Sequence, residues 1–145
     1  MNRTWMSRSA GALLVIIAVA LIPFLNSQGA LEQPVSLTVL FDRGTDLDDD
    51  AAMIIAKAVR ESLARPEAGI LVTGYTGSRG DEQANLALSE RRAEFIKSRL
   101  EDKGIEPERI DTVGLGGTEA LERKEGESDR AYQRRLARAD ILINP

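Results

Sequence analysis

The 145-residue sequence contains no cysteine and no histidine. Without cysteine there is no disulfide, no thiol nucleophile and no site for a lipid anchor on a thiol. Without histidine, the usual metal sites and the Ser-His-Asp and Cys-His catalytic arrangements are out of reach. Aromatic residues make up only 4% of the chain, so a core must be built mainly from Leu, Ile, Val and Ala. We therefore expect no enzyme activity, no cofactor and no metal ion.

A strongly basic surface is also missing. The net charge is −4, and no stripe of Lys and Arg is interleaved with aromatic residues, so nucleic acid is not an expected partner. Charged residues make up 29% of the chain and hydrophobic residues 43%, which is an ordinary globular balance. The length leaves room for one domain and an appendage.

The appendage is predicted at the N-terminus, over residues 1–30. Residues 10–25 form an uncharged apolar run that follows Arg3 and Arg8. As a helix, this run reaches roughly 24 Å, and the uncharged residues after it extend it toward the ~30 Å of a hydrocarbon core. Two interpretations compete: a signal anchor that stays in the membrane, with its basic end in the cytoplasm, or a signal peptide cut near Gly29. Either one exports the rest of the chain, and the length of the run slightly favours the anchor.

Residues 31–145 are predicted to form one α/β domain. Apolar alternation, helix-capping residues and turn residues indicate strand, helix, strand, helix, strand, short helix and strand in that order. This order predicts a two-layer sandwich, with helices packed on a small mixed sheet. The expected bounds are 35–41, about 46–64, 69–75, 81–103, 109–115, 129–136 and 137–143.

The first long helix is expected to bury one apolar face. The residues that share this face by spacing are Ala52, Ile55, Val59 and Leu63. An acidic cluster over residues 46–50 precedes them, and its spacing lacks the glycine and the final glutamate of a calcium-binding loop. We interpret the cluster as the first turn of the helix, where the helix dipole favours negative charge.

In the second long helix, an arginine lies in line with apolar residues. Arg92 shares a face by spacing with Leu88, Ile96 and Leu100. A partly buried guanidinium requires an acceptor, because leaving it unpaired is costly. From the residues alone, two acceptors remain open. One is a carboxylate of a ligand, and the other is an internal carboxylate from the set Asp42, Asp81 and Asp111.

The segment 71–93 carries a spaced motif, formed by Gly74, Thr76, Gly80, Asn85, Leu88, Ser89, Arg92 and Ala93. It resembles the signature G-H-T-D-x-x-G-x-x-x-x-N-x-x-L-S-x-x-R-A of the OmpA-like domains, a periplasmic module shared by OmpA, the lipoprotein Pal and the flagellar stator protein MotB. The resemblance extends across roughly residues 35–143, and ordered spacing over about twenty residues is far more specific than a lone glycine motif.

This resemblance implies a module that binds peptidoglycan non-covalently through the diaminopimelate of the stem peptide. By position, Arg92 matches the arginine that holds the diaminopimelate carboxylate. The aspartate that holds its ammonium falls at residue 77, which is Gly77 here. Losing a charge-assisted hydrogen bond of about 1.5–3 kcal/mol would weaken binding by roughly one to two orders of magnitude.

Other site residues are implied by the same resemblance. Thr76 belongs to the loop motif, and Asn85 and Ser89 are expected to shape the junction between the loop and the helix. Arg138 keeps its place in a closing segment similar to the family's N-R-R-V-[ED]-I, whereas Ala137 stands where the first arginine is usual.

Two functions are therefore expected. The first is a non-catalytic cell-envelope module on peptidoglycan, single-pass in the inner membrane with its domain in the periplasm, or exported to the periplasm or outer membrane after cleavage. The second is an interaction module or accessory subunit of an envelope complex that kept the fold and lost the ligand. An internal carboxylate on Arg92 would favour the second, and an open pocket between the loop 76–80 and Arg92 would favour the first.

Overall fold

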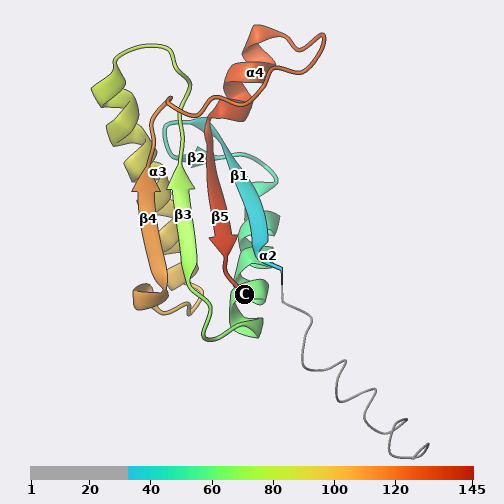
Figure 1. Cartoon of the computed structure of the whole chain (residues 1–145), viewed down its shortest axis with the longest axis vertical. Coiled ribbons are helices and arrows are strands. Elements are labelled where there is room, and N and C mark those ends of the chain that lie inside the picture. Colours follow the sequence, from blue (N-terminus) through green and yellow to red (C-terminus); the bar gives the residue numbers. More distant parts are fainter. Residues whose placement is uncertain (1–32) are drawn as a thin grey trace, which may run out of the picture. The chain divides into compact units, whose positions relative to one another are not determined.

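The computed structural model describes residues 33–145 (Figure 1). The predicted N-terminal helix, whether anchor or signal peptide, and the boundary after residue 30 lie outside the described residues. Over residues 33–145, neither of the long helices combines the length and the apolar character that crossing a bilayer requires.

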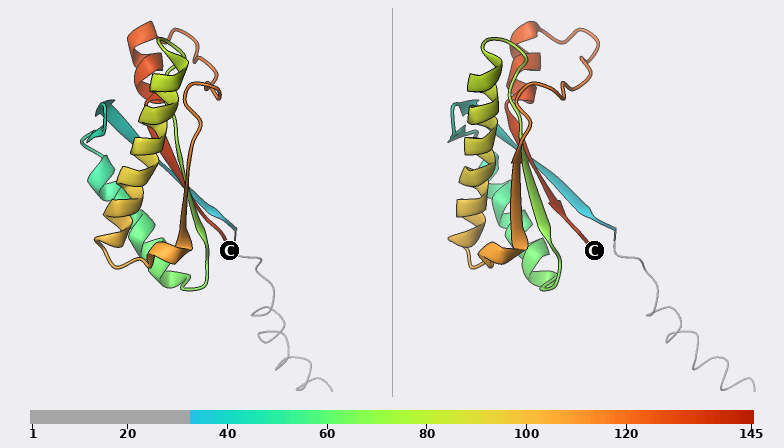
Figure 2. Two further views of the ribbon diagram at one scale, coloured as in Figure 1. Left: turned by 90° about the vertical axis from the view of Figure 1, so that its left-hand side faces the viewer. Right: turned by 60° about the vertical axis from the view of Figure 1, so that its left-hand side comes forward.

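Within residues 33–145, the strands form one five-stranded sheet in the order β2-β1-β5-β3-β4. Only β3 and β4 run parallel, and the other neighbouring pairs are antiparallel. Helices α2 and α3 lie against one face of this sheet (Figure 2), which confirms the expected α/β arrangement. The bounds are β1 Val35–Arg43, β2 Asp46–Leu47, α2 Ala51–Ala64, β3 Ile70–Gly74, α3 Glu82–Glu101, the 3-10 turn η1 Pro107–Arg109, β4 Ile110–Gly114, α4 Asp129–Leu136 and β5 Arg138–Ile143.

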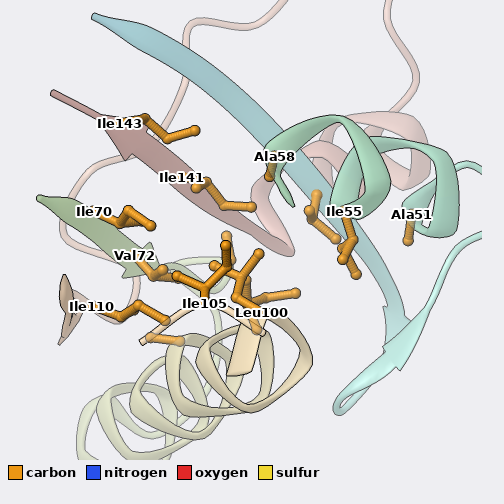
Figure 3. Close-up of a cluster of buried hydrophobic side chains, with 14 of the residues drawn as sticks. Ala51, Ile55, Ala58, Ile70, Val72, Leu100, Ile105, Ile110, Ile141 and Ile143 are labelled. Carbon is orange, nitrogen blue, oxygen red and sulfur yellow. The ribbon is translucent and has the colours of Figure 1, made fainter. Parts of the chain in front are cut away.

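The core lies between the helices and the helix-facing side of the sheet (Figure 3). Strand side chains alternate between the two faces, so Ile141 and Ile143 of β5 are fully buried against the helices. Leu100 of α3 and Ile55 of α2 fill the space above them. Aliphatic residues dominate this cluster, as the scarcity of aromatic residues predicts.

The face of α2 differs from the prediction. Its buried residues are Ala51, Ile55, Ala58 and Ser62, whereas the predicted Leu63 is 58% exposed. The buried positions are mostly small, which lets the helix lie close to the sheet, and small residues leave little trace in a hydrophobic pattern. The assignment of the acidic cluster was also wrong, because α2 begins after Asp50 and has no acidic residue in its first turn. Two residues of that cluster's segment form β2, which was not predicted.

Helix α3 approaches the sheet through glycines. A Cβ added to Gly74 would lie 1.9 Å from the carbonyl oxygen of Ser89, and one added to Gly114 would lie 2.6 Å from Ser89 Oγ. No side chain fits in this space, so backbone meets backbone where β3 and β4 end. This contact fixes the position of α3, and therefore of its polar residues, relative to the ends of β3 and β4.

Candidate functional site

The loop from β3 to α3 is tied to the first turn of α3. Asp81 caps the helix, and its carboxylate accepts a hydrogen bond of 2.7 Å from the backbone N–H of Ala84. One turn on, the Asn85 Nδ2 donates to the carbonyl oxygen of Arg79 at 2.9 Å. Asn85 therefore holds the loop against the helix.

Ser89 and Thr76 join this loop to the chain that follows β4. Ser89 is fully buried, and its Oγ accepts a bond of 2.8 Å from the backbone N–H of Gly116. The backbone N–H of Thr76 donates to the carbonyl oxygen of Gly116 at 2.8 Å, and Thr76 is 4% exposed. The two loops are thus held together by buried hydrogen bonds.

Arg92 lies one turn beyond Ser89 and is 4% exposed. Its Nε donates to the carbonyl oxygen of Gly44 at 2.8 Å, and its Nη1 donates to the carbonyl oxygen of Tyr75 at 2.7 Å. The guanidinium carbon lies 4.9 Å from the centre of the Phe41 ring, within the range of a cation–π contact. The side chain therefore links α3 to the end of β1 and to the end of β3.

The charge of Arg92 has no carboxylate partner among residues 33–145. The internal pairs considered for it, with Asp42, Asp81 or Asp111, do not form, and both acceptors are neutral backbone carbonyls. Burial alone lowers the pKa of Arg92 from 12.5 to about 10. Because even this pKa lies well above neutrality, the guanidinium stays protonated, and the site holds a desolvated cation without a compensating anion.

Gly77 lies beneath a side chain of α4. A Cβ added to Gly77 would lie 2.4 Å from Gln133 Oε1, so the amide of Gln133 fills the space that a side chain at residue 77 would enter. Figure 1 shows α4 beyond the ends of β3 and β4. An ion pair of 2.8 Å between Arg79 and Asp129 connects the same loop to the first turn of α4.

Arg138 is separated from Arg92 by the sheet. Successive side chains of β5 point to opposite faces of the sheet. Ala139 faces the helices, so the neighbouring Arg138 points to the other face. The Arg138 guanidinium carbon lies 3.9 Å from the centre of the Tyr75 ring, and its Nε donates to Asp140 Oδ2 at 3.3 Å. Arg138 is 5% exposed.

Comparisons with known proteins are consistent with this geometry. The model of the OmpA family matches residues 40–134, which is more than half of the chain. The chain belongs to the OmpA family. Among curated proteins, outer membrane protein A of Bordetella avium is 34% identical over 96 residues, covering 66% of this chain and 49% of the relative. The peptidoglycan-binding protein ArfA of Mycobacterium tuberculosis is 31% identical over 63% of this chain and 27% of its own length.

Solved structures support the fold of this OmpA-family chain. The peptidoglycan-associated lipoprotein of Burkholderia pseudomallei superposes with a TM-score of 0.65 at 25% identity, covering 74% of this chain and 90% of that one. The periplasmic domain of Helicobacter pylori MotB gives a TM-score of 0.62 at 18% identity, covering 78% and 75% of the two chains, which shows the fold alone. The chain spans half or less of the length of the two curated relatives above. The activity of either complete relative is therefore not assigned to this chain.

The predicted site residues of the OmpA-family domain fall into two groups. Thr76, Gly77, Asn85 and Ser89 gather at the loop junction, and Arg92 bonds to the carbonyl of the residue before Thr76. A cavity of about 490 Å³ opens beside this junction, lined in part by Asn85, and Arg92 is not among its lining residues. Arg138 lies apart from this group.

Two residues of the site were missed from the sequence. Tyr75 supplies both a carbonyl for Arg92 and a ring for Arg138, so it connects the two faces of the sheet. Gln133 enters from α4, more than fifty residues beyond Gly77 along the chain. No local spacing links these two positions, and only the placement of α4 brings them together.

Proposed function

We propose that this chain is a non-catalytic cell-envelope module that associates with peptidoglycan, with Arg92 as the residue that receives a carboxylate of the stem peptide. The names of ArfA and of the Burkholderia pseudomallei lipoprotein describe association with peptidoglycan, and the OmpA-like resemblance supplies the diaminopimelate carboxylate as the group for Arg92.

The single observation that carries this proposal is the uncompensated charge of Arg92. A buried cation is ordinarily paired, because desolvation costs several kcal/mol and neutral carbonyls return only part of it. Here the pKa of Arg92 falls to about 10 through burial, and no carboxylate in residues 33–145 makes an ion pair with it. An incoming carboxylate would restore the missing Coulomb energy, so the site is prepared for an anionic ligand.

Gly77 and Gln133 set the strength of this association. Glycine offers no anion for the ammonium of diaminopimelate, and the Gln133 amide that fills its place is neutral. We therefore expect an affinity roughly one to two orders of magnitude below that of a site with both charges.

We place the domain in the periplasm, tethered to the inner membrane through residues 1–30. If that segment is removed by cleavage instead, the domain is exported to the periplasm or the outer membrane. In both cases the domain meets peptidoglycan and the proteins of the envelope as its partners.

Co-sedimentation with peptidoglycan sacculi tests the proposal. The full chain in mild detergent is compared with Arg92→Ala and with Arg91→Ala, a matched control because Arg91 is the exposed neighbour on the same helix. We expect the wild type and Arg91→Ala to pellet, free diaminopimelate to release them, and Arg92→Ala to stay in the supernatant. Circular dichroism verifies that Arg92→Ala remains folded. A folded Arg92→Ala variant that pellets like the wild type would refute the role of Arg92.

The alternative is an interaction module or accessory subunit of an envelope complex that no longer binds peptidoglycan. Two observations favour it: Gln133 occupies the place of the missing side chain, and Arg92 already bonds to two carbonyls. If the wild type stays in the supernatant and the double variant Gly77→Asp/Gln133→Ala pellets, the fold has kept its site and lost its ligand. The alternative would then replace the first proposal.

A further inference from the structure

A groove lies between α2, the C-terminal end of α3 and β2, and the proposed function leaves it unused. It measures about 560 Å³, and Arg92 is not among the residues that line it. Its floor is apolar, because Ile55 is buried there and Leu47 and Val59 are half-buried. Helices α2 and α3 lie on the same face of the sheet (Figure 2), so the groove belongs to the helical side of the domain.

The α2 wall of the groove is the face that the sequence predicts to be buried. Ala52 and Val59 belong to that face and line the groove, and Ala56 lies between them on the same side of the helix. Leu63 extends this row by one turn and is 58% exposed. Toward the sheet, α2 buries mostly small residues instead. The helix therefore has two apolar faces, and the one along the groove is left partly exposed in the described part of the chain.

Basic side chains lie at the rim of the groove, although the whole chain carries a net charge of −4. Arg60 of α2 and Lys103 after α3 are exposed, and neither forms an ion pair within residues 33–145. Arg99 packs over the Phe95 ring, 4.7 Å from its centre, and its Nη1 lies 3.9 Å from Asp102 Oδ2. That ion pair is long and open to water, so it neutralises little. Three cations and one carboxylate thus surround the apolar floor.

We propose that this groove binds an amphipathic α-helix of a partner protein, whose apolar ridge enters the groove and whose Asp and Glu residues pair with the basic rim. A helix presents apolar side chains every three or four residues, and such a ridge packs into a row of the same spacing on its neighbour. The row from Ala52 to Leu63 spans roughly 16 Å, or about three helical turns. This length accommodates several successive anchors of one partner helix.

The rim charge selects an acidic partner over a second copy of this chain. Two copies that met groove to groove would bring their own cations together, Arg60 and Lys103 included, and like charges across an interface are repulsive. An acidic helix meets the same cations as counter-charges. Binding in this groove does not require Arg92, so it is compatible with either function considered above.

The probe is a synthetic, fluorescently labelled helical peptide with leucine on one face and glutamate on the others. It is compared with the same peptide carrying lysine in place of glutamate. The full chain is held in phosphatidylcholine nanodiscs, because detergent would itself occupy an apolar groove, and empty nanodiscs give the background. Ala56→Glu places a charge and extra volume in the groove. Ala64→Glu is its matched control, because Ala64 is an exposed alanine of the same helix that does not line the groove.

Fluorescence anisotropy should show the glutamate peptide binding at least about tenfold more tightly than the lysine peptide. Ala56→Glu should weaken this binding by about tenfold or more, with Ala64→Glu unchanged. Pelleting with sacculi should be the same in Ala56→Glu as in the wild type, which distinguishes this groove from the Arg92 site. The proposal is overturned if the glutamate peptide binds no better than it does to empty nanodiscs, if both peptides bind equally, or if Ala56→Glu binds like the wild type.

Reversing the rim charge separates recognition from a loss of folding. Arg60→Glu/Lys103→Glu should bind the lysine peptide more tightly than the glutamate peptide, because two exposed cations become anions. An unchanged preference for the glutamate peptide would contradict the proposal. Vesicles of anionic phosphatidylglycerol test a lipid surface as the occupant. If the full chain binds these vesicles, loses that binding in Ala56→Glu and does not bind the glutamate peptide, the groove takes lipid and the proposal is wrong.

Discussion

The two ends of the sheet are built in different ways, and each contains an arginine bonded to backbone carbonyls. At the end where β3 and β4 finish, glycines bring α3 into backbone contact, and Arg92 reaches two carbonyls. At the opposite end, aliphatic side chains such as Ile70 and Ile110 pack against α3. There Arg109 donates to the carbonyl oxygens of Ser62, Arg65 and Ala68.

The difference separates a structural arginine from a candidate binding arginine. Arg109 is half-buried, so water still solvates its charge, and its acceptors lie at and just after the C-terminus of α2, where carbonyls lack helical partners. Arg92 has fewer acceptors and far less water. Hydrogen bonds to backbone carbonyls therefore stabilise the fold at Arg109, whereas at Arg92 they leave the positive charge uncompensated.

The largest effect is expected from breaking the backbone contact at the glycine end. Gly74→Ala places a Cβ 1.9 Å from the Ser89 carbonyl oxygen, and neither backbone can move freely, so we expect a loss of about 3 kcal/mol or more in unfolding free energy. Gly69→Ala is the control, since its Cβ meets Asn144 at an ordinary 3.5 Å. Urea unfolding measures both. Equal stability of the two variants would show that the contact is not rigid.

Replacing Arg92 or Arg109 by methionine, in separate variants, tests the difference between the binding arginine and the structural arginine. Arg92→Met should abolish pelleting with sacculi and cost less stability than Arg109→Met, because removing a desolvated cation offsets part of the lost hydrogen bonding. Arg109→Met should retain pelleting and lose about 1–3 kcal/mol as its carbonyls lose their donor. The reverse pattern, with pelleting lost in Arg109→Met alone, would contradict the distinction.

Restoring an anion at residue 77 is expected to strengthen wall binding. Gly77→Asp/Gln133→Ala should gain about ten- to a hundredfold in affinity for sacculi, because the aspartate supplies a charge-assisted bond and the smaller side chain leaves it room. Gly77→Asp alone should gain less, since it must displace Gln133. Gln133→Ala alone serves as the control and should bind like the wild type. No gain in the double variant would mean that residue 77 does not face the ligand.

The smallest effect is a pH dependence in the segment before α4. Hydrogen bonds from Arg135 lower the pKa of Glu127 from 4.5 to about 2. A depressed carboxyl pKa stabilises the fold fully above pH 4.5, and this contribution is lost as the pH falls toward 2. Glu127→Gln should therefore lower the melting temperature at neutral pH and converge with the wild type near pH 2. A constant difference at all pH values would contradict this pairing.

The sequence predicts the parts of this fold that depend on local chemistry. Helix α4 begins at the expected Asp129, with Ser128 as its cap, and α3 begins at Glu82, one residue after its expected start, with Asp81 as its cap. Arg92 is buried as its spacing with Ile96 indicates. Each of these features is decided within one or two helical turns, where side-chain type and period carry the information.

Features that depend on distant contacts were not predictable. The acceptors of Arg92 are backbone carbonyls of Gly44 and Tyr75, and every residue has a carbonyl, so no residue type marks them. The contact of Gln133 with Gly77 depends on where α4 packs. In α2, Ala58 and Ser62 are buried because they are small, and a search for large apolar residues passes over them.

The sheet order has a consequence for how the protein is made. β5 is the last of the five strands in sequence, yet it lies between β1 and β3 and pairs with both. Until β5 has been synthesised, β1 has no strand to connect it to β3, and the edges of both stay open. Pairing residues about a hundred positions apart, such as Val39 with Ala139, also slows folding, because a long loop must close first. We therefore expect the central part of the sheet to form only after nearly the whole chain has been synthesised.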